Sequence, residues 1–111
     1  MTSSRAITKY VRISPRKIRL AAGLIRNLPV TEASFQLQVA NSKGGKLLKK
    51  TLDSAVANAE LQHDLKREEM KVIEVRVDDG PQIKRARPRS RGSRHPILKR
   101  TSHLTVVVGK E

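Results

Sequence analysis

The stretch from Gln82 to Arg100 reads QIKRARPRSRGSRHPILKR, and it decides how the rest of the 111-residue chain is interpreted. Eight of its 19 residues are Lys or Arg, and none is acidic. Such a stretch cannot pack onto a hydrophobic core, because burying unpaired guanidinium groups is too costly. It is therefore either a disordered loop or an ordered projection that an anionic partner stabilises.

The segments on both sides favour the ordered projection. Val72 to Val77 and His103 to Val108 are both strand-like, and Arg91-Gly92 lies near the midpoint, where a hairpin needs a turn. Pro88 and Pro96 fall one in each arm, so neither arm can form a complete ladder of hydrogen bonds. We expect a basic β-hairpin whose arms, of about nine residues each, reach on the order of 30 Å from the body.

Three helices are predicted before this hairpin. Ser14-Pro15 is typical of an N-cap followed by the first helical residue, and Pro29 is expected to end that helix. Thr31 can cap a second helix from Glu32 to about Ala40, and a glycine-bearing joint leads to a third from about Lys46 to Leu61. The apolar periodicity predicts buried faces in the first and third helices, made of Ile18, Ala21, Ala22 and Ile25, and of Leu48, Leu52, Ala55, Val56 and Ala59.

Three short strands complete the expected body. Residues 7–13 are predicted to place Ile7, Val11 and Ile13 on one face, and Asp78 to Pro81 carries the signal of a turn or bulge. The inward side chains expected in the other two strands are Ile73, Val75 and Val77, and Leu104, Val106 and Val108. The sequence thus predicts one α+β domain over residues 1–111, with three helices packed on a small three-stranded antiparallel sheet and a long protruding basic β-hairpin at 82–100.

The charge of the chain is concentrated at its two ends. The formal net charge is +14, and it divides into +7 for residues 1–31, −1 for residues 32–80 and +8 for residues 81–111. The chain has no cysteine, which excludes disulfide scaffolds, zinc fingers and thiol catalysis. No apolar run approaches the roughly 18–20 residues of a membrane span, and the N-terminal segment does not have the pattern of a signal peptide.

Nucleic acid is the partner that this charge pattern favours. Guanidinium groups match phosphate oxygens bidentately, which favours a nucleic-acid partner. The alternative interpretation of such a run is a basic surface loop or a localisation signal. Tyr10 and Phe35 are the only aromatic residues, so stacking platforms for bases are absent. No predicted helix has the pattern of a DNA-recognition helix that enters the major groove next to a dimer interface. The remaining mode is recognition of the shape and the backbone phosphates of the nucleic acid, which suits a folded RNA. With about eight phosphates neutralised, the slope of log affinity against log salt would be about −6.

The other candidate motifs are weak. Lys43-Gly44-Gly45-Lys46 resembles a phosphate cradle but lacks the phosphate-loop spacing, so a flexible helix start is the preferred interpretation. His63, His95 and His103 share no metal-ligand spacing, and Asp78-Asp79 is typical of a turn. Ser102-His103 is not a catalytic pair, because neighbours along a strand point to opposite faces. We therefore expect a protein with no enzymatic activity, no cofactor and no metal.

Several stretches form a recognisable set: Lys84, Arg89-Ser90, Gly92-Ser93, His103-Leu104, Val106 and Val108, together with Ser14 to Arg19, Ser54 to Glu60, Asp78 to Pro81 and Lys99 to His103. Taken together, these stretches resemble the family of large-subunit ribosomal protein twenty-two in its short bacterial form. The resemblance covers nearly the whole chain.

This resemblance implies a cytoplasmic protein of the large ribosomal subunit that binds 23S ribosomal RNA and acts early in subunit assembly. In the family, the body lies near the outer mouth of the polypeptide exit tunnel, and the hairpin threads through the RNA. The hairpin tip helps line the tunnel wall, opposite a loop of large-subunit protein four, and changes near it can alter macrolide sensitivity. The implied partners are ribosomal RNA, other large-subunit proteins and the nascent polypeptide, with no membrane and no homo-oligomer.

Carried over to this chain, the resemblance places the tip at Arg89, Ser90, Arg91, Gly92, Ser93 and Arg94. The expected RNA-binding residues are Lys9, Arg12, Arg16, Lys17, Arg19, Lys84, Arg85, Arg87, Arg89, Arg91, Arg94, Lys99 and Arg100. Gly92-Ser93-Arg94, followed by His95-Pro96, departs from the Gly-Arg-Ala that many relatives have at the tip. This departure concerns the residue-level contacts of the tip and any drug sensitivity, and it leaves the body and the RNA-binding role unchanged.

Two rivals from other classes remain open. An architectural DNA-binding protein can also grip the minor groove with a Pro-bearing β-arm, although such proteins are usually dimers and no self-complementary apolar surface is evident here. A cationic nuclease would have to use Asp78 and His103.

Overall fold

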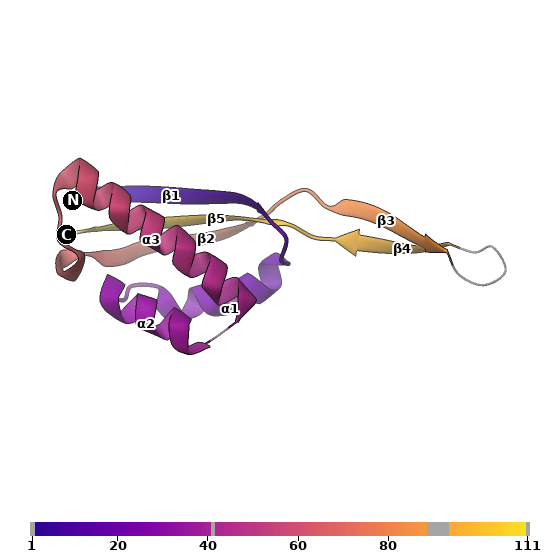
Figure 1. The fold of residues 1–111 in the computed structure, drawn as a ribbon, viewed down its shortest axis with the longest axis horizontal. Coiled ribbons are helices and arrows are strands. Elements are labelled where there is room, and N and C mark those ends of the chain that lie inside the picture. Colours follow the sequence, from indigo (N-terminus) through magenta and orange to yellow (C-terminus); the bar gives the residue numbers. More distant parts are fainter. Residues whose placement is uncertain (1, 41, 89–93, 111) are drawn as a thin grey trace.

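The computed structural model of the protein describes residues 2–40, 42–88 and 94–110. Figure 1 shows a body of helices and strands from which a narrow two-stranded hairpin extends. No helix among the described residues is long and apolar enough to cross a membrane. The elements in chain order are β1 (Thr2–Val11), α1 (Pro15–Ile25), α2 (Val30–Ala40), α3 (Lys43–His63), a 3-10 turn (Arg67–Glu69), β2 (Lys71–Asp79), β3 (Ile83–Pro88), β4 (Arg94–Lys99) and β5 (Ser102–Lys110).

The sheet of the body is three-stranded and antiparallel, in the order β1-β5-β2. Its central strand, β5, pairs along one edge with β1 and along the other with β2, so Val106 lies opposite both Ala6 and Val75. Leu104, Val106 and Val108 of this strand are fully buried, as their alternation predicts. The predicted α+β class and its small antiparallel sheet are confirmed.

The helices supply the rest of the core. Helix α3 packs on β1 and β5, whereas α1 packs on β2 (Figure 1). The apolar faces predicted for α1 and α3 are both buried, because the 3.6-residue period places these side chains on one side of each helix. Helix α2 adds Val30, Ala33 and Leu37 to the same core.

The basic segment forms the predicted hairpin outside this core. Strands β3 and β4 pair only with each other in a separate antiparallel sheet, with Ala86 opposite Pro96 and Pro88 opposite Arg94. Each described strand has six residues, and the chain is not in a strand at Gln82 or at Arg100. The rest of each expected nine-residue arm lies outside the described residues. The longest dimension of the molecule is 63 Å and its radius of gyration is 17.0 Å, against about 13 Å for a compact domain of this size. The expected turn at Arg91-Gly92 lies outside the described residues.

Strand β1 differs from its prediction at both ends. It starts at Thr2 and ends at Val11, and its register with β5 shifts between Thr8 and Val11. Within this irregularity, Tyr10 has a φ of 59°, which reverses the alternation of inward and outward side chains. Val11 is buried as predicted, but Ile7 is 47% exposed, so the prediction that it faces the core is wrong.

Strand β2 contains a similar shift. Its register with β5 changes between Val72 and Glu74, so Val72 is fully buried and Ile73, predicted to face the core, is only partly buried. Asp78 and Asp79 do not form the predicted turn, because they continue β2 and pair with β5. The chain leaves the strand at Gly80 instead.

The predicted helix boundaries also need correction. Helix α1 ends at Ile25, four residues before Pro29, because Asn27 takes a left-handed conformation (φ 64°) and its N–H donates to Val72 of β2. Helix α2 begins at Val30, so Thr31 is already helical.

Helix α3 begins at Lys43, three residues earlier than predicted. The side chain of Ser42 accepts a hydrogen bond from the N–H of Gly45 at 2.9 Å and caps this helix. A Cβ on Gly44 would lie 3.3 Å from Ile18 of α1, so the first turn of α3 packs closely against α1. The glycines predicted to form a joint are therefore a packed helix start.

Candidate nucleic-acid interface

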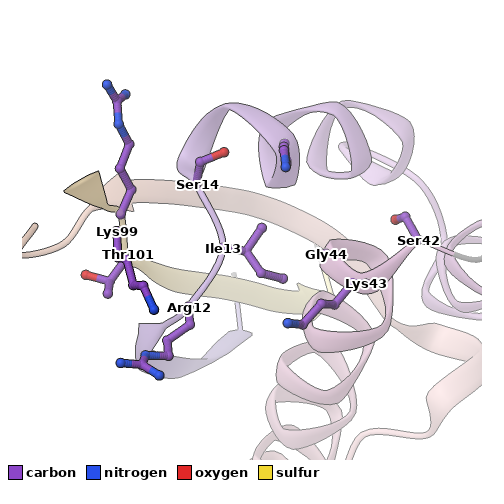
Figure 2. Close-up of a pocket in the computed structure, with 10 residues that line it drawn as sticks. Arg12, Ile13, Ser14, Ser42, Lys43, Gly44, Lys99 and Thr101 are labelled. Atoms are coloured by element: carbon purple, nitrogen blue, oxygen red, sulfur yellow. The ribbon is translucent and has the colours of Figure 1, made fainter. Parts of the chain in front are cut away.

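A cleft of about 590 Å³ lies at the root of the hairpin, and we call it the basal cleft. Three segments far apart in the sequence form its walls: the β1–α1 connection, the start of α3, and the junction between β4 and β5. Figure 2 shows Arg12, Lys43 and Lys99 around one opening, each from a different segment. The lining residues are Arg12, Ile13, Ser14, Lys17, Ser42, Lys43, Gly44, Lys99, Arg100 and Thr101.

Half of these lining residues are cationic, and none is acidic. The structure brings together four of the predicted RNA-binding residues, Arg12, Lys17, Lys99 and Arg100, and all four are exposed. It adds Lys43, which belongs to the weak Lys43-Gly44-Gly45-Lys46 motif at a helix start. The absence of acidic residues around Lys43-Gly44-Gly45-Lys46 is the sequence signal that could have identified it.

A buried hydrogen bond fixes one wall of the basal cleft. The hydroxyl of Ser102, which is fully buried in β5, donates to the backbone carbonyl of Ile13 at 2.6 Å. This bond holds the β1–α1 connection against the central strand. Ser14 occupies the N-cap position of α1, yet its side chain makes no capping hydrogen bond.

A second set of bonds, which we call the hairpin clamp, joins the two arms where they leave the body. It consists of Gly80, Pro81 and Thr101: the Thr101 hydroxyl donates to the carbonyl of Pro81 at 2.6 Å, and the Gly80 N–H donates to the carbonyl of Thr101 at 2.9 Å. A Cβ on Gly80 would collide with the Thr101 hydroxyl, so glycine is required for this close approach. Because Thr101 also lines the basal cleft, the clamp and the cleft share a residue.

Three of the predicted RNA-binding residues of the body lie outside the cleft. Lys9 and Arg16 are exposed on β1 and α1. The guanidinium of Arg19 donates to the carbonyl of Val77 at 3.0 Å and lies 3.7 Å from the carboxylate of Asp79. Arg19 therefore ties α1 to β2, a structural role that the sequence pattern did not reveal.

The remaining predicted residues belong to the hairpin. Lys84, Arg85 and Arg87 lie in β3, and Arg94 is the first residue of β4. Arg89 and Arg91 lie outside the described residues, as do the predicted tip residues Ser90, Gly92 and Ser93.

No set of three or more His, Cys, Asp or Glu residues in the described part of the chain could hold a metal ion. Ser102 and His103 make separate contacts, as predicted: the Ser102 hydroxyl donates to Ile13, whereas Nδ1 of His103 accepts from the N–H of Tyr10 at 3.1 Å. The rings of Tyr10 and His103 also pack edge to face, with centroids 5.0 Å apart.

The fold and this surface define a class: a small, basic α+β protein with a cationic hairpin and a cationic cleft. The family model described as "Ribosomal protein L22p/L17e" matches residues 6–109. Large ribosomal subunit protein uL22 of Protochlamydia amoebophila is 68% identical over 108 residues, which cover 97% of each chain. The proteins of the same name from Chlamydia abortus and Chlamydia felis are 64% and 62% identical, over 96% of each chain.

The chain therefore belongs to the ribosomal protein L22p/L17e family. Members of this family are structural components and not enzymes, so the cationic nuclease alternative is excluded.

Proposed function

We propose that this protein is a structural component of the large ribosomal subunit in the cytoplasm, where it binds 23S ribosomal RNA and supports subunit assembly. The proposal is supported by relatives above 60% identity that are named large ribosomal subunit proteins. Its partners are ribosomal RNA and neighbouring proteins of that subunit.

One observation carries the RNA-binding part of the proposal: the acid-free segment 82–100 contains two strands, β3 and β4, that pair with each other and extend from the body. Two strands that pair only with each other gain little from a hydrophobic core, so an isolated hairpin of this kind has marginal stability in water. Ribosomal RNA supplies the missing stabilisation, because binding to the ordered form lowers its free energy by mass action.

The mechanism is the neutralisation of phosphates that would otherwise repel one another where RNA segments converge. The body holds the hairpin by its root through the hairpin clamp, and the basic arms follow the RNA outward. Guanidinium groups along the arms bind phosphate oxygens with charge-assisted hydrogen bonds.

The tip, at Arg89 to Arg94, lines the nascent polypeptide exit tunnel in this proposal. The family resemblance of the flanking residues supports this assignment. It makes the nascent chain the third partner of the protein.

Co-sedimentation with large subunits across a salt gradient tests the proposal. We expect the protein to sediment with the large subunit at low salt and to dissociate steeply, with a slope near −6 in log affinity against log salt. Release with a slope near zero would contradict phosphate neutralisation.

Crosslinking in cells separates the RNA and DNA alternatives. We expect the chain to be recovered mainly on 23S ribosomal RNA. Recovery mainly on chromosomal DNA would overturn the proposal in favour of the architectural DNA-binding protein.

A further inference from the structure

We propose that Arg19 and Arg26 of α1 cover the free edge of β2 and prevent the protein from pairing with a second copy of itself through that edge. We call these two side chains the edge seal. An exposed edge strand carries unpaired N–H and C=O groups, and these groups can extend a sheet from one molecule into the next. The edge seal acts on the free protein, so its role is independent of RNA binding.

Strand β2 is an edge strand, because it lies at one end of the order β1-β5-β2. The carbonyls of Val75 and Val77 point away from β5, since both accept hydrogen bonds from side chains of α1. The N–H groups of the same two residues point the same way, because both backbone groups of a residue in an antiparallel strand face one neighbour. These four groups form the edge that another strand would use.

The edge seal covers these groups with two guanidinium groups. Nη2 of Arg26 donates to the carbonyl of Val75 at 3.1 Å, and Nη2 of Arg19 donates to the carbonyl of Val77 at 3.0 Å. The two arginines are about two helical turns apart, which places them on one flank of α1, beside β2 (Figure 1). Val75 and Val77 are only 2% and 6% exposed, so little of either residue is open to another strand.

The start of the β2 edge is covered by backbone instead. Val72 donates its N–H to the carbonyl of Leu28 and accepts from the N–H of Asn27, and both partners lie in the α1–α2 connection. At its other end, β2 stops at Asp79. The edge seal therefore lies on the part of this edge that the α1–α2 connection leaves uncovered, residues 75–79.

The opposite edge of the sheet is covered in the same way by a different helix. Nδ2 of Asn58 in α3 donates to the carbonyl of Arg5 in β1 at 3.0 Å. Nε2 of His63, also in α3, lies 3.0 Å from the carbonyl of Ser3, and it is the donor because a carbonyl only accepts. Side chains of the adjacent helix thus cover carbonyls on both outer strands, so the covering of the β2 edge is not an isolated contact.

A second copy of the chain is the partner that the β2 edge fits when the seal is absent. Antiparallel pairing of two β2 strands about Val77 would set Arg76 of each copy opposite Asp78 of the other. Both residues are exposed, and opposite charges at facing positions stabilise antiparallel strands. The edge seal opposes this pairing, because the guanidinium groups of the two copies would meet at the shared edge and repel one another.

A double variant that removes the edge seal tests this role. Arg19→Gln with Arg26→Gln has shorter side chains and loses both bonds to β2. The matched control is Arg12→Gln with Arg16→Gln, which removes the same charge from exposed side chains that bond to no carbonyl of β2. Sedimentation equilibrium of the nucleic-acid-free proteins measures their self-association.

We expect the unchanged protein to remain a monomer of 12.4 kDa. The variant without the edge seal should dimerise at least about tenfold more tightly than the matched control. A dimer of the unchanged protein would overturn the proposal. Equal dimerisation of the two double variants would also overturn it, because lost charge repulsion alone would then explain the result.

Adding Arg76→Glu to the variant without the edge seal identifies the surface that pairs. This change puts like charges opposite each other across two β2 strands, so we expect the dimer dissociation constant to rise at least about tenfold. It also lowers the net charge of +14, which by itself favours association, so the two effects predict opposite results. Dimerisation that persists unchanged would place the contact on another surface and refute the proposal.

Circular dichroism and amide NMR spectra check that the variants fold. If the double variant does not fold, Arg26→Gln alone decides, because it leaves the bond between Arg19 and Val77 in place. We expect this single variant to dimerise about threefold more tightly than Arg16→Gln, its matched control. The same dissociation constant for both single variants would contradict a role of Arg26 in the edge seal.

Discussion

The body and the hairpin of this molecule are stabilised in opposite ways. In the body, apolar side chains of three helices and three strands are buried, and its middle segment, residues 32–80, carries a net charge of only −1. In the hairpin, eight cations and no acid occupy 19 residues, and the two strands pair only with each other. The difference places the hydrophobic core in one region, and under the proposed function the other region gains its stability from RNA.

Removing the outer hairpin gives the largest expected effect on binding. Replacing residues 87–96 by a single glycine leaves Arg85 opposite Ile97, joined by a two-residue loop. Four cations disappear, so we expect the salt slope to fall in magnitude by about 3 and the affinity for the large subunit to fall about a thousandfold at 0.1 M salt. Co-sedimentation measures this loss, and circular dichroism should show an intact body. Unfolding of the body would break the division between the two regions.

The same division predicts that truncation in the core affects folding strongly. Leu52→Ala removes a fully buried side chain of α3, and we expect the free energy of unfolding to fall by about 2–5 kcal/mol. Leu61→Ala is the matched control in the same helix, because Leu61 is 87% exposed and its loss should cost less than about 0.5 kcal/mol. Urea denaturation measures both values, and similar losses would contradict the assigned core.

A pair of glycine variants examines the hairpin clamp, where the two regions join. Gly80→Ala should destabilise the protein by about 1–3 kcal/mol, because the new methyl group would collide with the Thr101 hydroxyl. Gly23→Ala should instead stabilise α1 by about 0.5–1 kcal/mol, since no atom lies within 4 Å of the added Cβ. Thermal unfolding distinguishes the two, and equal shifts would show that the clamp contributes nothing.

The smallest expected effects separate structural from binding arginines on α1. Arg19→Gln removes the bond to Val77 and should lower the free energy of unfolding by about 1 kcal/mol or less. Arg16→Gln, at an exposed position of the same helix, should leave stability unchanged but weaken binding to ribosomal RNA. If Arg16→Gln destabilised the protein as much as Arg19→Gln does, the structural role given to Arg19 would be lost.

The buried helix faces and the hairpin were predictable because both depend on local patterns. Ile18 and Ile25, or Leu48 and Leu52, recur with the period of a helix, and that period fixes which side is buried. Strand faces were less predictable, since the register shifts near Tyr10 and after Val72 reverse an alternation that the sequence pattern continues.

The basal cleft shows a different limit of sequence reasoning. Arg12, Lys43 and Lys99 lie about thirty to ninety residues apart, and their proximity depends on how α3 and β5 pack against β1. The sequence marked most of these cations as binding residues, because the ends of the chain are poor in acids. It could not show that they share one opening, since no local pattern records contacts between distant segments.

The central position of β5 has a consequence for the order of events during synthesis. Neither β1 nor β2 has a partner in the sheet until residues 102–110 have been made, because β5 lies between them and follows both in the chain. Thr2 pairs with Lys110, and this pairing has the largest sequence separation in the sheet. Such non-local contacts slow folding. The arms of the hairpin are therefore synthesised before the body can complete its sheet and hold them.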